Sequence, residues 1–348
     1  MSLRTALAAL VLAAGAPGIG ATPAAAGPAD AGPINSVMTG DIVPTHDPVL
    51  VKQNGTYYVF GTGMPGASGQ YLLARTSPDL IHWTAQGPLF TSIPAWALQA
   101  VPGTKEMWAP DVSFWGGRYH LYYAVSTFGS NRSAIGLFTS PTLDPKAPGY
   151  GWKDEGLVVM STQADDFNAI DPNHVIDRQG RHWLALGSFW SGIKLFALNP
   201  ATGKLLDPRE KPISLARRHA PAGGPAPVEA PFIVSHGDYY YLFVSYDYCC
   251  KGVNSTYYTV MGRAKDITGP YVGRDGSRLM DGEGTIILRG DLQEQQRFRG
   301  PGHSGFLHDD DGTDYIVYHA YDKQNKGAST LRISPIAWDA DGWPSAVR

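Results

Sequence analysis

Five segments of this chain share one pattern, and that repetition limits the possible fold more than any other feature. Each segment begins with an acidic residue or a histidine, continues into an apolar strand, turns at glycine and returns through a strand rich in large apolar and aromatic residues. The five first residues are Asp47, Asp111, Asp171, Glu229 and His303, and they are spaced by 64, 60, 58 and 74 residues. Units of this length with an internal hairpin are typical of propeller blades built from four strands and long loops. The sequence therefore predicts an all-β, five-bladed β-propeller.

The hairpin pattern can be read in every unit. Paired strands are expected at 49–51 with 57–60, 112–115 with 119–123, 174–176 with 183–186, 232–234 with 239–243, and 305–307 with 315–318. If each first residue begins an innermost strand, the five side chains point toward one end of the central channel. The alternative is that acid-proline pairs only mark strand starts, where proline is tolerated. Residues 201–227 are expected to connect two blades, and the strand at 332–338 to close the ring with an edge from the other end of the chain.

Composition excludes some classes of partner. The chain has 28 basic and 31 acidic residues, a net charge of -3 and no dense run of Lys or Arg. Nucleic acid and membrane surfaces are therefore not expected as partners. The 41 glycines, 27 prolines and 11% aromatic residues favour a turn-rich all-β chain over a helical one.

The N-terminus has the pattern of an export signal. Arg4 precedes an apolar run at 6–14, which is too short to span a bilayer and is followed by Ala, Gly and Pro. We expect a signal peptide at 1–26, with cleavage between 22 and 33, and a single catalytic propeller domain at 34–348. The mature protein is predicted to be secreted, extracellular and monomeric, and a retained anchor is the alternative.

Cys249 and Cys250 are the only cysteines, and they are adjacent. They cannot join distant segments, so the stability of the fold must come from its core. A vicinal disulfide would make a rigid kink in the loop after the Glu229 unit. Two small buried side chains are the alternative, and the sequence leaves both open.

The acidic residues of the repeat suit glycoside hydrolysis, which needs two carboxyl groups in opposite protonation states on either side of the scissile bond. A channel end lined by Asp47, Asp171 and Glu229 supplies two such groups and a third. Crowded carboxylates raise one another's proton affinity, so that one can remain an acid near neutral pH. The repeat also brings aromatic residues near this end, where they would suit the apolar faces of sugar rings or, alternatively, pack between blades: Trp108, Phe128 and Trp190.

His303 is the exception among the first residues. A histidine among carboxylates can bind a metal, tune a carboxylate or make structural hydrogen bonds. Zinc is not expected, because no second His or Cys lies at ligand spacing. A cation would be held largely by water and carboxylate oxygen, which fits calcium best.

At these residues the sequence resembles the arabinanases of glycoside hydrolase family 43, from about Thr45 to the C-terminus. No single stretch is specific, but the set in this order is. The matching stretches are His46-Asp47-Pro48, Trp108-Ala109-Pro110-Asp111, Tyr123 to Gly129, Asn168-Ala169-Ile170-Asp171-Pro172, Gly187 to Ile193, Glu229-Ala230-Pro231 and Gly302-His303-Ser304.

The resemblance implies a five-bladed propeller that hydrolyses with inversion of configuration. Asp47 would be the general base, Glu229 the general acid, and Asp171 the carboxylate that orients the acid and raises its pKa. His303 would be the ligand of a calcium ion on the axis. With the aromatic residues of the repeat, the expected substrate-binding set is Asp47, Trp108, Phe128, Gly129, Asn168, Ala169, Ile170, Asp171, Ser188, Phe189 and Trp190.

The implied substrates are arabinan, a pectin side chain, and arabino-oligosaccharides. The form of residues 126–131 and 188–192 indicates endo cleavage of α-1,5-L-arabinofuranosidic bonds. Inversion would require the carboxyl groups of Asp47 and Glu229 to lie about 6.5–9.5 Å apart. The alternatives are an exo-acting α-L-arabinofuranosidase or β-xylosidase on the same scaffold, and a carbohydrate-binding propeller without catalysis.

Overall fold

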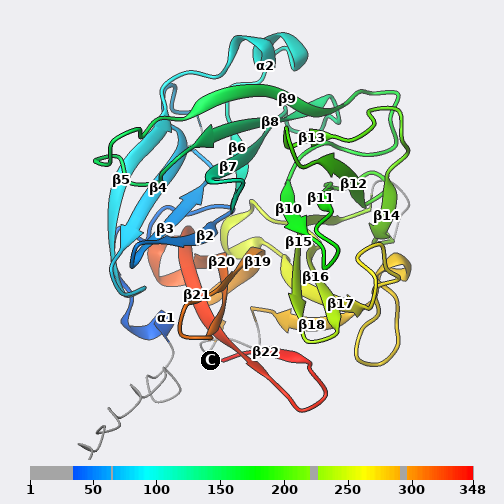
Figure 1. Ribbon diagram of the computed structural model, residues 1–348. Helices are drawn as coiled ribbons and strands as arrows, with labels where there is room; N and C mark the ends of the chain where they lie inside the picture. Colours follow the sequence, from blue (N-terminus) through cyan, green and yellow to red (C-terminus); the bar gives the residue numbers. More distant parts are fainter. Residues whose placement is uncertain (1–33, 64–65, 220–225, 291–295, 348) are drawn as a thin grey trace, which may run out of the picture.

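The computed structural model describes residues 34–63, 66–219, 226–290 and 296–347, which form a ring of five sheets around a central axis (Figure 1). The prediction of an all-β, five-bladed propeller is confirmed. The expected signal peptide at 1–26 lies outside the described residues. No helix within the described part of the chain is long and apolar enough to cross a membrane.

Each blade is an antiparallel sheet whose strands follow chain order from the axis outward. The first contains β2 (Val49–Gln53), β3 (Thr56–Gly61), β4 (Tyr71–Ser77) and β5 (His82–Phe90), with β1 (Thr39–Gly40) parallel to β5 at the outer edge. The second contains β6 (Trp108–Trp115), β7 (Arg118–Val125), β8 (Ser133–Ser140) and β9 (Lys153–Ser161). The third contains β10 (Asn173–Ile176), β11 (His182–Leu186) and β12 (Ile193–Asn199), and both β13 (Lys204–Leu205) and β14 (Ile213–Ala216) pair with β12.

The fourth blade contains β15 (Val228–His236), β16 (Tyr239–Tyr246), β17 (Tyr258–Ala264) and β18 (Thr285–Leu288). The fifth contains β19 (Phe298–His308), β20 (Asp314–Asp322), β21 (Ala328–Trp338) and β22 (Pro344–Ala346). Short helices lie in the connections: α1 (Ile34–Val37), α2 (Ala95–Ala100), η2 (Gly252–Asn254), η3 (Leu279–Asp281) and η5 (Lys323–Asn325).

The five predicted hairpins are present with their glycine turns. The expectation that 201–227 only connects two blades is wrong, because β13 and β14 form the outer part of the third blade there. Leu215 and Ala216 of β14 are buried in the apolar cluster shared with the fourth blade. Their short pattern is hidden in the sequence by the surrounding Pro, Gly and Arg.

Five clusters of buried apolar residues each fill one interface between neighbouring blades. The second strand of a blade feeds two clusters, because successive side chains of a strand point to opposite faces. In β7, Leu121 packs toward the first blade and Tyr122 toward the third. In β16, Leu242 and Phe243 divide in the same way between the third and fifth blades. This double burial explains why the second strands are apolar on both faces.

The ring is closed by the N-terminal segment, which lies along β21 of the fifth blade. The Thr45 amide donates to the Ser329 carbonyl at 3.0 Å, and the Leu331 amide donates to the Ile42 carbonyl at 2.9 Å. The buried Asn35 side chain accepts from the Ile333 amide at 2.7 Å. The strand expected at 332–338 lies within β21 and thus meets the other end of the chain through these bonds.

Each innermost strand is preceded or interrupted by one residue in the left-handed backbone region, and these residues mark the equivalent positions of the five blades. They are Asp47 (φ 50°), Ala109 (46°), Asp171 (57°), Ala230 (55°) and His303 (50°). Non-glycine residues rarely adopt this conformation, and it clusters at functional sites. The predicted equivalence is therefore right for Asp47, Asp171 and His303 but wrong for Asp111 and Glu229.

A bulge explains the two errors. In β6, Trp108 pairs with Ala124 and Asp111 with Tyr122, so Ala109 and Pro110 form the bulge. In β15, Glu229 pairs with Ser245 and Phe232 with Phe243, which places Ala230 and Pro231 in the same role. Asp111 thus lies two residues beyond the equivalent position, and Glu229 one residue before it.

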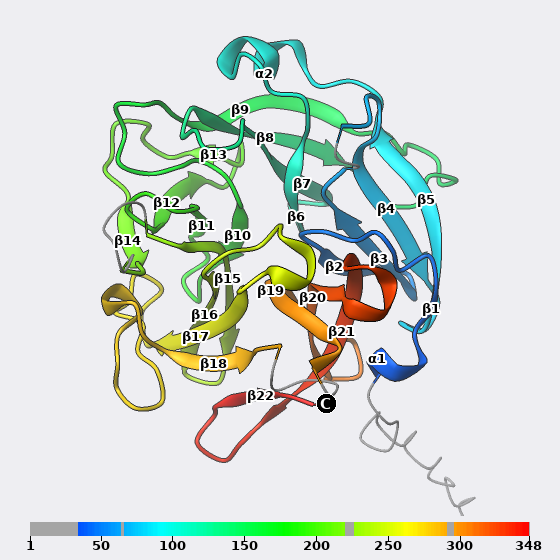
Figure 2. The same cartoon turned by 180° about the vertical axis from the view of Figure 1, so that it is seen from behind.

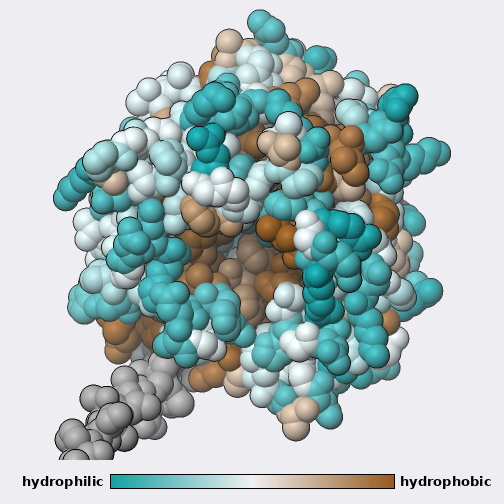
Figure 3. All heavy atoms as spheres, viewed as in Figure 1, coloured by the Kyte–Doolittle hydropathy of each residue, from teal (hydrophilic) through white to brown (hydrophobic). Residues whose placement is uncertain are grey.

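The propeller has two different ends. The end that faces the viewer in Figure 1 is hollowed at its centre, where apolar residues gather inside a hydrophilic rim (Figure 3). The loop that contains η2 lies at the opposite face, which is turned toward the viewer in Figure 2. This loop lies beside the left-handed residues described above, since the Cys250 sulfur is 3.9 Å from His46 Nε2.

Candidate active site

Hydrogen bonds from one blade to the next fix the left-handed residues around the axis. The backbone amides of Ala109, Ala230, His303 and Asp47 each donate to a side chain of the preceding blade: Thr62 Oγ1 (2.9 Å), Asp171 Oδ2 (3.1 Å), Ser245 Oγ (2.9 Å) and His319 Nδ1 (3.2 Å). Gly302 is needed beside His303, because a Cβ there would lie 2.3 Å from the Tyr257 ring. The structure thus places Asp47, Asp171 and His303 at one end of the channel, with Glu229 one residue from Ala230.

Asp47 is surrounded by hydrogen-bond donors. Its Oδ1 lies 2.7 Å from His46 Nδ1 and 3.0 Å from His303 Nδ1, and its Oδ2 accepts the Thr62 hydroxyl at 2.5 Å. Burial raises the pKa of Asp47, but the charges and hydrogen bonds of His46 and His303 outweigh burial and hold the pKa well below its usual range. Asp47 is therefore ionised at neutral pH, as a general base must be.

The pKa of Glu229 is shifted in the opposite direction. Burial raises the pKa of Glu229, against the hydrogen bond in which the Ser188 hydroxyl donates to its Oε2 at 2.7 Å. Ser188 reaches Glu229 from a tight turn of the third blade in which Phe189 (φ 56°) and Trp190 (φ 42°) are left-handed. The Phe189 amide donates to the Val228 carbonyl at 2.8 Å, which joins this turn to β15.

Asp171 links the two catalytic candidates. Its Oδ2 accepts the Ala230 amide, so it holds the backbone next to Glu229. Burial raises the pKa of Asp171, the charge of His303 opposes burial, and the charges of Glu229 and Asp47 raise the pKa further. Asp171 is buried and Glu229 is half-buried. Because their charged forms repel each other, the two carboxyl groups share a proton, which keeps an acid at this site near neutral pH.

Asp111 has a structural role, because it binds the backbone of the neighbouring blade. It is 3% exposed, and its Oδ2 accepts the His174 amide of the third blade at 2.7 Å. Burial raises the pKa of Asp111 to about 7. Asp111 therefore ties the second blade to the third rather than facing a substrate.

His303 supplies the positive charge of the cluster. Burial lowers its pKa, but the charges of Asp47, Asp171 and Glu229 raise it to about 9. One positive charge among three carboxylates suits either an imidazolium or a bound cation. The donor set includes one imidazole nitrogen and carboxylate oxygens, so a calcium ion would fit only if water supplied most of its six to eight ligands.

Two further histidines converge on Asp47, and sequence reasoning missed them as site residues. Among the described residues, one group could hold a metal through three side chains: the ligand atoms of His46, Asp47 and His319 lie within 4.8 Å of one another. The His46 and His319 rings stack at 3.9 Å between centroids, and His46 Nε2 lies 2.8 Å from the Tyr321 hydroxyl. His319 pairs with Gly302 in the β19–β20 hairpin, but no spacing in the sequence shows that it also meets Asp47.

Two aromatic pairs lie around the carboxylates. Phe128 is 83% exposed, and its ring lies 5.5 Å from the half-buried Trp108 ring. Phe189 lies 5.7 Å from the ring of Tyr248, which is 43% exposed and was not predicted. Exposed aromatic side chains beside a polar site are typical of sugar binding, because they cover the apolar faces of sugar rings.

The remaining predicted binding residues have different surroundings. Trp190 is half-buried, and Gly129 (φ 77°) lies in the turn that follows Phe128. Asn168 is 3% exposed, and its Oδ1 accepts the Ser133 hydroxyl at 2.6 Å. The side chains of Ala169 and Ile170 are also buried, in the cluster between the second and third blades. Residues 168–170 are therefore buried and position Asp171 from the protein interior.

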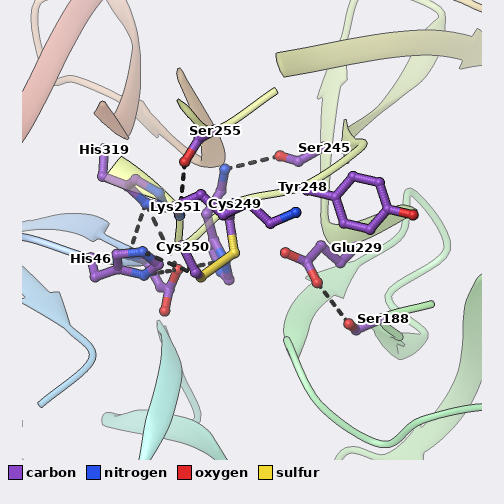
Figure 4. The surroundings of a disulfide bond; sticks show 12 residues. His46, Ser188, Glu229, Ser245, Tyr248, Cys249, Cys250, Lys251, Ser255 and His319 are labelled. Atoms are coloured by element: carbon purple, nitrogen blue, oxygen red, sulfur yellow. Dashed lines mark hydrogen bonds and ion pairs between the residues drawn. A yellow bond between two sulfur atoms is a disulfide. The ribbon is translucent and has the colours of Figure 1, made fainter. Parts of the chain in front are cut away.

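The two cysteines form a vicinal disulfide, so the alternative of two buried thiols is wrong. Figure 4 shows the bond beside His46, Glu229 and Tyr248.

Comparisons with known proteins identify one family, with both endo- and exo-acting relatives. Residues 35–344 match the family described as glycosyl hydrolases family 43. The chain is 43% identical over 301 residues to the extracellular endo-alpha-(1->5)-L-arabinanase 1 of Bacillus subtilis, covering 86% of this chain and 87% of the relative. It is 40% identical over 309 residues to the extracellular exo-alpha-(1->5)-L-arabinofuranosidase ArbA of Cellvibrio japonicus, covering 87% and 86%.

Solved structures agree. An exo-1,5-alpha-L-arabinanase from a bovine ruminal metagenomic library superposes with a TM-score of 0.82 at 44% identity, over 89% of this chain and 99% of that one. A Cellvibrio cellulosa alpha-L-arabinanase in complex with arabinohexaose superposes with a TM-score of 0.80 at 38% identity, over 88% and 96%.

Proposed function

The chain belongs to the glycosyl hydrolases of family 43, and we propose that it hydrolyses α-1,5-L-arabinofuranosidic bonds of arabinan by endo cleavage with inversion. The proposal rests on opposite pKa shifts of two carboxyl groups near one axis: the pKa of Asp47 is held low and the pKa of Glu229 is raised. When the environments of two carboxyl groups shift their pKa values in opposite directions, the group with the lower pKa is suited to act as the base and the other as the acid. The names of the relatives supply the sugar, since both act on α-(1->5)-linked arabinose.

In the proposed reaction, Asp47 accepts a proton from a water molecule that attacks the anomeric carbon. Its Oδ1 is held by His46 and His303 and its Oδ2 by Thr62, so the carboxylate has a fixed orientation. Glu229 donates its proton to the leaving oxygen. Because the water attacks from the face opposite the leaving group, the product has the inverted configuration.

Asp171 is a positioning residue in this scheme. Its hydrogen bond to the Ala230 amide sets the backbone beside Glu229. Besides burial, the charge of Glu229 raises the pKa of Asp171, and because this repulsion is reciprocal, a charged Asp171 favours the protonated form of Glu229. Ser188 fixes the Glu229 carboxyl group from the other side.

Endo action is supported by the distribution of exposed aromatic residues. Phe128 with Trp108 belongs to the second blade, whereas Phe189 with Tyr248 spans the third and fourth. Contacts on more than one blade would let a polymer pass across the axis. The second candidate is exo action, which is favoured by the name of the ruminal structure at 44% identity.

The product series from linear arabinan distinguishes the two. Endo cleavage predicts arabino-oligosaccharides of several lengths at early times, whereas release of one short product from the first minutes would favour exo action. Absence of new reducing ends would reject both in favour of a binding protein. Release of xylose from xylo-oligosaccharides at a comparable rate would overturn the choice of sugar.

A calcium ion on the axis is part of the proposal, with His303 as its protein ligand. Such an ion would add positive charge beside Asp47, Asp171 and Glu229. We expect chelation to lower the melting temperature of the wild type and added calcium to restore it. His303→Gln should show no such response, and an unchanged melting temperature of the chelated wild type would reject the ion.

Secretion and a monomeric state complete the proposal. Both curated relatives described above are named extracellular. Export of a tagged full-length chain, with loss of the first 22–33 residues by mass spectrometry, would test the first. Sedimentation of the mature protein would test the second.

A further inference from the structure

The Cys249–Cys250 disulfide has no evident role in holding the chain together. A disulfide stabilises a fold mainly by closing a loop in the unfolded chain, and the effect grows with the length of that loop. These two residues are adjacent, so no loop is closed. What the bond fixes is the local shape of the segment between β16 and β17.

That segment presents the disulfide to the site. Cys250 is exposed and Cys249 half-buried. The Cys250 sulfur lies 3.9 Å from His46 Nε2. In the view of Figure 4 the two sulfur atoms lie between His46 and the Glu229 carboxyl group. Sulfur is polarisable and only weakly polar, so the pair forms a small apolar surface among charged groups.

The segment is also connected to Asp47. The Cys250 amide donates to the Tyr321 hydroxyl at 2.9 Å, and that hydroxyl lies 2.8 Å from His46 Nε2. His46 Nδ1 in turn lies 2.7 Å from Asp47 Oδ1. The position of the disulfide is therefore fixed relative to the carboxylate proposed as the base.

Tyr248 extends the same surface. Its amide donates to Thr256 Oγ1 at 3.2 Å, and the Lys251 ammonium lies 4.6 Å from the centre of its ring. Tyr248 also meets Phe189, whose turn holds Ser188 against Glu229. The segment thus meets His46 through Cys250 and, through Tyr248, the turn whose Ser188 binds Glu229.

We infer that the Cys249–Cys250 disulfide is a sugar-contact element: it packs against the apolar face of the furanose ring bound between Asp47 and Glu229 and thereby sets substrate affinity. The inference rests on the proposed function and adds a binding contact to its site. A rigid contact restricts the ring without ordering a flexible side chain on binding, which favours affinity.

The test compares the wild type with the double variant Cys249→Ser, Cys250→Ser on arabinohexaose. Loss of the sulfur contact predicts an increase in KM of about fivefold, which corresponds to about 1 kcal/mol of binding free energy. The kcat should change less than twofold, and the melting temperature should stay the same. Val253→Ala, an exposed position in the same segment, is the matched control and should leave KM unchanged.

Chemical reduction of the wild type is an independent way to break the Cys249–Cys250 bond. A water-soluble phosphine takes up one oxygen from water and becomes the phosphine oxide, while the disulfide takes two electrons and two protons and becomes two thiols. The treated wild type should show a raised KM, and the serine variant should not respond to the phosphine. Alkylation followed by mass spectrometry must show both cysteines blocked before reduction and free after it.

The outcomes separate the two proposals. If the wild type hydrolyses arabinohexaose and the KM of the serine variant is unchanged, the inference fails and the proposed function stands. A lower melting temperature with a fall in kcat would show a structural role and would also overturn the inference. Free thiols in the untreated protein would do the same. A wild type that neither binds nor hydrolyses arabinohexaose would overturn the proposed function and the inference with it.

Discussion

Replacing Asp171 with Asn should move the alkaline limb of the pH–activity profile to lower pH. Glu229 must be protonated to act as the acid, so activity is retained below its pKa in the enzyme and lost above it. Burial, together with the charge of Glu229, raises the pKa of Asp171 to about 8. Because repulsion between two carboxylates is reciprocal, the Asp171 charge raises the pKa of Glu229 in turn, and an amide does not. The Asn Oδ1 can still accept the Ala230 amide, so the local backbone is kept.

Ser188→Ala provides the opposite perturbation. Its hydroxyl donates to Glu229 Oε2 at 2.7 Å, which favours the ionised form. A hydrogen bond to a charged group contributes about 1.5–3 kcal/mol. Since Glu229 is half-buried and water screens part of this interaction, the lower end applies. A change of about 1.4 kcal/mol alters the protonation ratio tenfold, so the alkaline limb should rise by about one pH unit.

The assay is kcat/KM on arabinohexaose between pH 4 and pH 10 for the wild type and both variants. We expect the alkaline limbs of the two variants to move in opposite directions from that of the wild type. Limbs that move the same way, or that do not move, would refute the assignment of Glu229 as the acid. Circular dichroism of each variant serves as the control for folding.

Three further perturbations follow from the structure. Phe128→Ala should raise the KM for arabinohexaose severalfold at an unchanged melting temperature, because this ring is 83% exposed; an unchanged KM would remove it from the binding surface. Thr62→Val should destabilise the fold in urea by about 1.5–3 kcal/mol relative to Thr62→Ser, because the hydroxyl donates to Asp47 and accepts from the Ala109 amide; equal unfolding midpoints would contradict the proposed tie between blades. Burial and the charges of neighbouring histidines lower the pKa of His174 to about 3, so the stability that neutral His174 provides is complete above about pH 6.5 and is lost as pH falls toward 3. Asp111, whose pKa is raised to about 7, affects stability with the opposite sign, so the measurement compares the wild type with His174→Gln. Below pH 6.5 the unfolding free energy of the variant should rise with pH less steeply than that of the wild type, by about 1.4 kcal/mol per pH unit. Equal slopes of unfolding free energy against pH would contradict this role of His174.

The ring could be predicted because the hairpin of each blade is recognisable in the sequence as two apolar strands joined by a glycine turn. Successive residues such as Leu121 and Tyr122 both face apolar interfaces, which gives apolar strands that are easy to recognise. Glycine turns mark their ends. β13 and β14 have only two and four residues, which is too short to show this signal.

The equivalence of the five first residues was predicted only in part. Aligning the units on their acidic residues placed Asp111 and Glu229 in register with Asp47, whereas the bulges make Ala109 and Ala230 equivalent to it. Proline follows four of the five left-handed residues. An alignment on proline would have found the correct register in those four units, but not in the fifth, where Ser304 follows His303.

The contents of the site were harder to predict than its position. Asp47, Asp171 and Glu229 could be chosen because their type and order carry the chemistry. His46 and His319 belong to the first and fifth blades, which are far apart in the sequence, so only ring closure brings them together. The same closure brings Cys250 to His46, and no local pattern reveals that contact.

Proton NMR of the purified protein acting on linear α-1,5-arabinan tests endo cleavage and inversion together, because one spectrum reports both the length of the products and the anomer formed first. We expect oligosaccharides whose new reducing ends appear first in the inverted β configuration and equilibrate later. Reducing ends that appear first in the α configuration would show retention and contradict the assignment of Asp47 as the base and Glu229 as the acid.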